Sequence, residues 1–92
     1  MLTTTYRING RVQGVGFRFT VMMVAQRLDL TGTVKNEQNG SVTVVLNATE
    51  NEATHFIESL KDEVRRGFAV ISTIDIVDQT DQTPESTFRI IY

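Results

Sequence analysis

The chain has 92 residues with a formal net charge of −2, a length typical of one small domain. Its hydrophobic share of 40% is ordinary for a globular protein, whereas the absence of cysteine excludes disulfides, thiolate catalysis and cysteine-ligated metals. The weakly acidic charge balance argues against a nucleic-acid-binding protein. No apolar run approaches the roughly 20 residues of a membrane span, and no signal-peptide pattern opens the chain. We therefore expect one cytoplasmic domain over residues 1–92.

The first half of the chain alternates between strand and helix patterns. Apolar and polar residues alternate over residues 6–12 and predict a first strand. Apolar residues then recur at helical spacing over residues 17–28, which predicts an amphipathic helix. Gly32 follows shortly after and is a candidate stop for this helix. Strand-like residues resume over residues 34–36 and again over residues 41–48.

The second half adds another helix and two further strand segments. A capping box, in which Glu52 follows Thr49 by three positions, opens an apolar stripe at helical spacing and predicts a helix as far as Val64. A β-rich segment over residues 70–77 predicts a strand, and the polar residues 78–86, with the single proline, predict a loop. Alternating apolar residues from position 88 to the end of the chain predict a short final strand.

The predicted order is therefore β-α-β-β-α-β with one further short strand. Two helices that each carry an apolar stripe can both bury it only by lying on one face of a common sheet. We predict an α+β fold, a two-layer ferredoxin-like sandwich with a mainly antiparallel sheet and both helices on one face.

The side chains of the central hairpin favour one register over another. A two-residue loop at Asn39-Gly40 would turn the apolar face of one strand against the wrong face of its partner. A three-residue loop over residues 38–40, with Gly40 left-handed, pairs Asn36 with Val42 and gathers the valines on one buried face. We therefore predict the three-residue loop, which turns Asn36 toward the helices.

The segment between the first strand and the first helix is rich in glycine and ends on an arginine. Gly14 and Gly16 allow left-handed backbone conformations and a close approach to a ligand. A loop that enters a helix presents unpaired N–H groups and the positive end of the helix dipole to an anion. Arg18 adds a charge and a planar set of donors that can bind two oxygens together. This arrangement predicts a cradle for an oxyanion of phosphate size.

Topology is expected to bring a second polar residue to this cradle. Strands in a β-α-β unit run parallel, so their C-terminal ends lie at the same edge of the sheet. Asn36, near the end of the second strand, should therefore lie close to the loop that carries Gly14 and Gly16. Purely structural alternatives remain open: the glycines shape a tight turn, Arg18 pairs with a carboxylate, and Asn36 bonds a neighbouring backbone group.

Two segments resemble the signatures of the acylphosphatase family. The run Gly10-Arg11-Val12-Gln13-Gly14-Val15-Gly16-Phe17-Arg18 is similar to the first signature at every position. The run Gly32-Thr33-Val34-Lys35-Asn36, followed by Gly40 and Val42, resembles the second. The resemblance implies the sandwich fold and hydrolysis of the carboxyl-phosphate bond of acyl phosphates. It implies that Arg18 binds the phosphoryl group and that Asn36 orients the attacking water. It further implies a phosphate site completed by the loop, with backbone amides of Gln13, Gly14, Val15, Gly16, Phe17 and Arg18.

The chain departs from the usual family pattern at three positions. Thr33 stands where an aromatic residue is usual, Ala48 where glycine is frequent, and Phe68 where proline commonly follows the end of the second helix. None of these positions is assigned to the chemistry, so the functional expectation stands.

The expected protein is a monomeric, metal-free enzyme without a cofactor, with an acyl phosphate as substrate and inorganic phosphate as product. Because a carboxylate leaves unprotonated at neutral pH, no general acid is required. The first rival is a non-catalytic anion-binding or regulatory domain of the same fold. The second is an RNA-binding module, which would need exposed aromatic residues on its central strands. His55, the only histidine, is expected to be structural or exposed.

Overall fold

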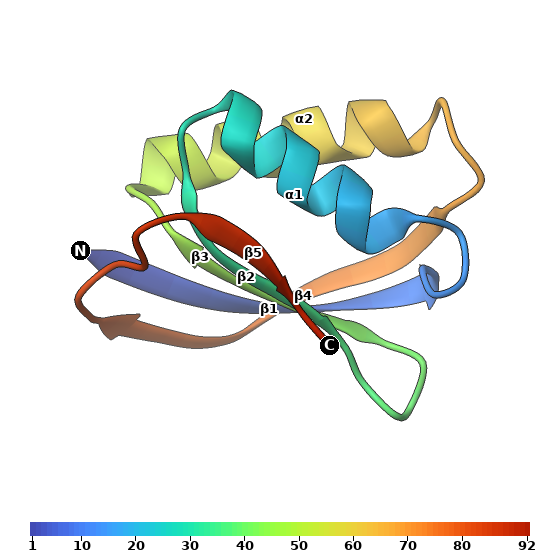
Figure 1. The fold of residues 1–92 in the computed structure, drawn as a ribbon, viewed down its shortest axis with the longest axis horizontal. Coiled ribbons are helices and arrows are strands. Elements are labelled where there is room, and N and C mark those ends of the chain that lie inside the picture. Colours follow the sequence, from blue (N-terminus) through green and yellow to red (C-terminus); the bar gives the residue numbers. More distant parts are fainter.

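The computed structural model describes residues 1–92 and has the predicted order of elements (Figure 1). Local sequence accounts for both helix starts: Thr49 and Glu52 form the predicted capping box, and the left-handed Gly16 precedes the first helix. The elements are β1 (Leu2–Arg11), α1 (Phe17–Arg27), β2 (Thr31–Asn36), β3 (Val42–Asn47), α2 (Glu50–Val64), β4 (Val70–Asp81) and β5 (Phe88–Ile91).

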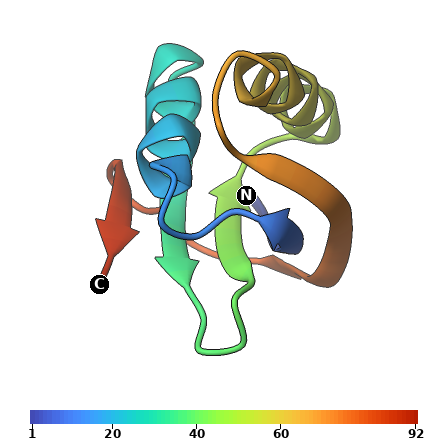
Figure 2. The ribbon, with the colours of Figure 1, turned by 90° about the vertical axis from the view of Figure 1, so that its right-hand side faces the viewer.

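Five strands form one twisted sheet in the order β4-β1-β3-β2-β5, and both helices cover the same face of it (Figures 1 and 2). Every neighbouring pair is antiparallel except β2 and β5, which are parallel. The predicted α+β ferredoxin-like sandwich is therefore confirmed. Since β3 lies antiparallel between β1 and β2, these two strands run in the same direction and end at the same edge.

The core lies between the sheet and the two helices. Phe17 of α1, Phe56 of α2 and Phe88 of β5 are fully buried, and burial of a large apolar side chain stabilises a fold by roughly 1.5–3 kcal/mol. The inward face of β3 supplies a row of buried aliphatic side chains, namely Val42, Val44 and Leu46. This row explains why the hydrophobic pattern fixed the register of the central hairpin.

The three-residue loop of the hairpin is confirmed. Val34 pairs with Val44 and Asn36 with Val42, and Gly40 has a positive φ of 93°. The N–H of Glu37 donates to the carbonyl oxygen of Ser41 at 2.9 Å, which closes the hairpin outside the loop. Asn36 consequently lies at the end of β2 on the same side as the buried Val42.

The predicted start of β1 and the predicted end of β4 are both wrong, for one shared reason. β1 begins at Leu2 instead of position 6, and β4 continues to Asp81 through residues 78–81, which the polar composition had predicted as loop. These residues pair with each other across a bulge at Thr5, so backbone pairing extends a polar edge strand that periodicity does not reveal.

Gly32 does not stop α1. The helix ends at Arg27, and the left-handed residue that follows is Asp29, with a φ of 57°. Gly32 instead lies inside β2 with a φ of 146°, where a Cβ would overlap the carbonyl oxygen of Val45. The glycine is therefore required by the close approach of β3, which sequence alone did not indicate.

Replacing Gly32 by alanine is expected to lower the free energy of unfolding by more than about 1 kcal/mol, because the new Cβ meets the backbone of β3 at an unfavourable φ. The matched control is Gly67→Ala, since a Cβ at Gly67 meets no atom and the backbone there is not left-handed. The control should change stability by less than about 0.5 kcal/mol. Urea unfolding of both variants measures the difference, and equal stabilities would contradict the assigned role of Gly32.

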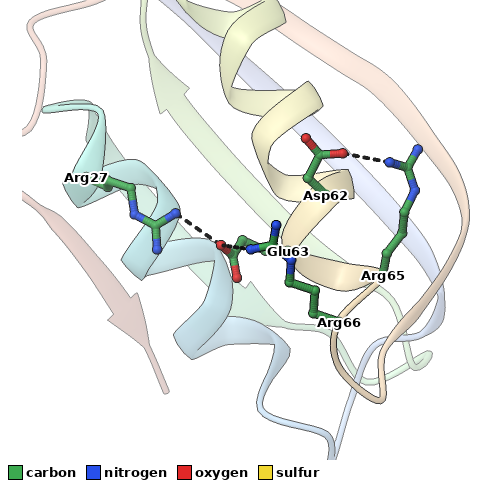
Figure 3. Close-up of polar contacts among 5 residues, drawn as sticks. All are labelled: Arg27, Asp62, Glu63, Arg65 and Arg66. Atoms are coloured by element: carbon green, nitrogen blue, oxygen red, sulfur yellow. Dashed lines mark hydrogen bonds and ion pairs between the residues drawn. The ribbon is translucent and has the colours of Figure 1, made fainter.

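An acidic residue links the two helices on the outer side of the molecule. The Glu63 carboxylate of α2 accepts from Arg27 of α1 at 3.1 Å and faces Arg66 at 3.7 Å, as Figure 3 shows. A separate pair joins Asp62 and Arg65 at 2.6 Å. The arginines are largely exposed, so these pairs contribute little stability and leave the packing of the helices to the core.

Candidate active site

The loop of residues 12–16, which joins β1 to α1, depends on two left-handed glycines. Gly14 has a φ of 74°, and Gly16, the N-cap residue of α1, has a φ of 77°. A Cβ at either position would meet no atom within 4 Å, so open space lies beside both residues. The glycines are therefore needed for the backbone conformation and leave room in front of the loop.

The start of α1 is suited to an anion. The first turn of a helix leaves its N–H groups without intrahelical partners. Thr20 is the first residue of α1 whose N–H bonds back, to the carbonyl oxygen of Gly16 at 3.1 Å. No acidic residue lies in this first turn, so nothing there offsets the positive end of the helix dipole.

Arg18 extends from this first turn without a carboxylate partner. It takes part in none of the ion pairs of the molecule, so the alternative in which it only neutralises a carboxylate is wrong. Its guanidinium carbon lies 5.0 Å from the centre of the Tyr92 ring, a cation–π contact. The planar donors of the guanidinium therefore remain available to an oxyanion.

Asn36 carries a buried polar atom that nothing in the protein satisfies. Its side-chain oxygen Oδ1 is inaccessible and accepts no hydrogen bond, which excludes the alternative in which this oxygen bonds a neighbouring backbone group. A buried acceptor without a partner costs about 1–3 kcal/mol. Unpartnered groups of this kind call for an explanation, and a donor such as a water molecule would satisfy this one.

A cavity of about 250 Å³ brings the loop, Arg18 and Asn36 together. The ends of β1 and β2 lie on the same side of the molecule, where Figure 1 shows the β1–α1 loop and the β2–β3 hairpin on the right. The lining combines elements that are far apart in the sequence: Val12, Gly14, Gly16, Phe17, Arg18, Phe19, Asn36, Ile90 and Tyr92.

Two aromatic residues at this cavity were not predicted from sequence as site residues. Phe19 is 60% exposed and Tyr92 is 92% exposed, yet both line the cavity beside Arg18. The available signals were the position of Phe19 directly after Arg18 and the alternation that placed Tyr92 in the final strand. Neither signal shows that β5 ends beside α1, which follows from the parallel pairing of β5 with β2.

Two members of the predicted loop do not line the cavity. The Gln13 side chain turns away to the hairpin, where its Nε2 donates to the carbonyl oxygens of Glu37 and Ser41. Val15 packs against the hydrophobic core. Any contribution of these two residues to an anion site would come from their backbone N–H groups, as the resemblance implied.

Two larger grooves, of about 580 and 620 Å³, lie between α2 and β4. Large size usually favours a cavity as a candidate site. Neither groove is lined by an arginine without an ion-pair partner at the start of a helix, and neither is lined by a residue with an unsatisfied buried acceptor. We therefore take the smaller cavity as the candidate active site.

The remaining candidate positions lie away from this cavity. His55 is exposed on α2 beside Leu28 and Glu52. The three departures from the family pattern, Thr33, Ala48 and Phe68, do not line the cavity either. No three His, Cys, Asp or Glu side chains gather as a set of metal ligands, and neither helix is long and apolar enough to cross a membrane.

Comparison with known proteins agrees with the geometry. A family model described as Acylphosphatase matches residues 4–90. The acylphosphatase of Lactobacillus gasseri is 40% identical over 95 residues, and the match covers 100% of both chains.

Solved structures give the same result. The crystal structure of acylphosphatase from Bacillus subtilis matches with a TM-score of 0.84 at 34% identity, covering 100% of both chains. The acylphosphatase structure from Coxiella burnetii matches with a TM-score of 0.81 at 30% identity, covering 97% of this chain and 90% of that one. On the agreement of sequence and fold, this chain belongs to the acylphosphatase family.

Proposed function

We propose that this protein hydrolyses the carboxyl-phosphate bond of acyl phosphates, with the phosphoryl group bound by Arg18 and the β1–α1 loop and the attacking water oriented by Asn36. The acylphosphatase family consists of hydrolases that act on acid anhydrides, and this chain belongs to it. The observation that supports these residue roles best is that one cavity is lined both by Arg18, which has no ion-pair partner, and by Asn36, whose buried side-chain oxygen is unsatisfied.

The phosphoryl group fits the charge of the cavity. Backbone N–H groups from Gln13 to Arg18 would donate to its oxygens, and the guanidinium of Arg18 would bind two of them together. Phosphoryl transfer has a loose transition state, so fixed donors and positioning supply most of the catalysis. The exposed rings of Phe19 and Tyr92 border the cavity and can pack against an apolar acyl group.

Asn36 suits the attacking water. Its orphaned Oδ1 has no partner to lose, so a rotation of the side chain that exposes it would let it accept an O–H from a water molecule and so fix the direction of the oxygen lone pair. The water oxygen forms a bond to phosphorus as the bond between phosphorus and the acyl oxygen breaks. The electron pair of that bond leaves with the carboxylate, and one proton of the water passes to a phosphoryl oxygen, so a dianionic substrate gives a carboxylate and monoanionic dihydrogen phosphate.

The same site explains a preference for acyl phosphates over phosphate monoesters. A carboxylate is the conjugate base of an acid with a pKa of about 4, so it departs without a proton at neutral pH. An alkoxide needs a general acid: beside the weakly acidic phenol of Tyr92, no side chain in the cavity lining carries a carboxyl, imidazole or ammonium group. Since no such group is available as a metal ligand either, we expect activity without a metal or other cofactor. We further expect a single-domain monomer that acts in the cytoplasm without a nucleic-acid partner.

Phosphate release from benzoyl phosphate in the presence of a chelator tests this proposal. We expect sustained hydrolysis of benzoyl phosphate and little hydrolysis of p-nitrophenyl phosphate under the same conditions. The second candidate, a non-catalytic anion-binding domain, is favoured by the same cradle. Binding of inorganic phosphate without any release from benzoyl phosphate would overturn the enzymatic proposal in its favour.

A further inference from the structure

The side chain of Gln13 joins the two halves of the candidate site. Its Nε2 lies 2.7 Å from the carbonyl oxygen of Glu37 and 2.9 Å from that of Ser41. A carboxamide nitrogen has two N–H groups, so both are used in these bonds. Gln13 is the neighbour of Gly14 in the β1–α1 loop of residues 12–16, which we call the cradle loop, and Glu37 is the neighbour of Asn36.

No strand pairing holds the cradle loop to the hairpin at this point. β1 pairs with β3 only as far as Ile8, which lies opposite Val42, whereas β1 continues with β4 to Arg11. The chain therefore leaves β3 before it reaches Gln13. Among the hydrogen bonds of the molecule, the two from Gln13 are the ones that connect residues 12–16 with the hairpin.

The hairpin end of this connection is itself firmly held. Glu37 and Ser41 bond each other through the backbone at 2.9 Å, and Thr43 donates to the Glu37 carboxylate at 2.6 Å. The side-chain oxygen of Asn39 accepts from both the N–H and the hydroxyl of Ser41 at 3.0 and 2.6 Å. Gln13 thus attaches the loop to a rigid support directly beside Asn36.

We infer that Gln13 is a positioning residue, whose carboxamide fixes the distance between the phosphate-binding loop and Asn36. This inference rests on the proposed function. The phosphoryl group is bound by the loop that carries Gln13, and the water is oriented by Asn36, next to the Glu37 carbonyl that Gln13 contacts. The two hydrogen bonds from Gln13 therefore set the position of the water relative to phosphorus. A misplacement of about 1 Å between reacting groups can cost on the order of 10²-fold in rate.

The test variant is Gln13→Met, which keeps the length of the side chain and removes both hydrogen-bond donors. The control is Gln38→Met, the same change at an exposed position of the β2–β3 hairpin. Gln13→Met should lower kcat for benzoyl phosphate by about 10-fold or more, while the inhibition constant of inorganic phosphate changes less than about threefold. Gln38→Met should match the wild type. Gln13→Ala serves as a second variant, and thermal unfolding establishes the folded fraction of each at the assay temperature.

A double-mutant cycle with Asn36→Ala identifies the route of the effect. If Gln13 acts through Asn36, Gln13→Met should have little further effect in the Asn36→Ala background. A kcat for Gln13→Met within twofold of the wild type, an equal loss of kcat and phosphate binding, or an undiminished effect in the double variant would each overturn the inference. Failure of the wild type to hydrolyse benzoyl phosphate would instead overturn the proposed function.

Discussion

Replacing Arg18 by alanine is expected to lower kcat/KM for benzoyl phosphate by more than about 10²-fold. Removal of one preorganised donor typically costs about 3 kcal/mol in the transition state, and Arg18→Ala removes a charge together with a bidentate donor. Arg18 has no carboxylate partner whose charge would be exposed by the substitution, so the fold should tolerate the change. Steady-state phosphate release measures the loss.

Two further variants show what property of Arg18 matters. Arg18→Lys keeps the charge but cannot reproduce the planar set of donors, so we expect it to remain far below the wild type. Arg11→Ala removes an exposed arginine that does not line the cavity, so its activity should be unchanged. Near-normal turnover by Arg18→Lys would contradict the bidentate role.

The substitution Asn36→Ala is expected to lower kcat on the order of 10²-fold while inorganic phosphate binds with nearly unchanged affinity. The reason is that Asn36 is assigned to orient the water, whereas the β1–α1 loop and Arg18 are assigned to bind the phosphoryl group. Removing the side chain also removes a buried oxygen that lacks a partner, so stability should not fall greatly. Turnover of benzoyl phosphate and inhibition by phosphate, measured together, separate the two effects.

Asn51→Ala, at an exposed position of α2, provides the control for Asn36→Ala and should behave as the wild type. If Asn36→Ala reduced phosphate binding and kcat by the same factor, Asn36 would hold phosphate or the fold. Its assignment to the water would then be wrong.

Much of the fold could be predicted because burial imposes a period on the sequence. The apolar stripe from Ala53 to Leu60 specifies the buried face of α2, and the alternation in β3 specifies its inward face. Once that face is known, only one loop length places Val34 opposite Val44. The meeting of Asn36 with the cradle loop then follows from the parallel direction of β1 and β2.

The features that were missed depend on contacts between distant segments. Residues 78–81 are polar and exposed, and they form a strand only because Leu2 to Thr5 lies beside them. Gly32 marks the close approach of Val45, which is a property of the partner strand. In the same way, the hydrogen bonds from Gln13 join residues that are 24 and 28 positions apart in the chain, and no local sequence pattern predicts them.

A phosphoryl group is expected to bind where the β1–α1 loop, Arg18 and Asn36 meet. Titration of the ¹⁵N-labelled protein with inorganic phosphate, followed by amide chemical shifts, locates the bound phosphate residue by residue. We predict saturable shifts concentrated in the backbone amides from Gln13 to Arg18, with the side-chain amide of Asn36 also affected. Saturable shifts confined to the grooves between α2 and β4, with the loop amides unchanged, would contradict it.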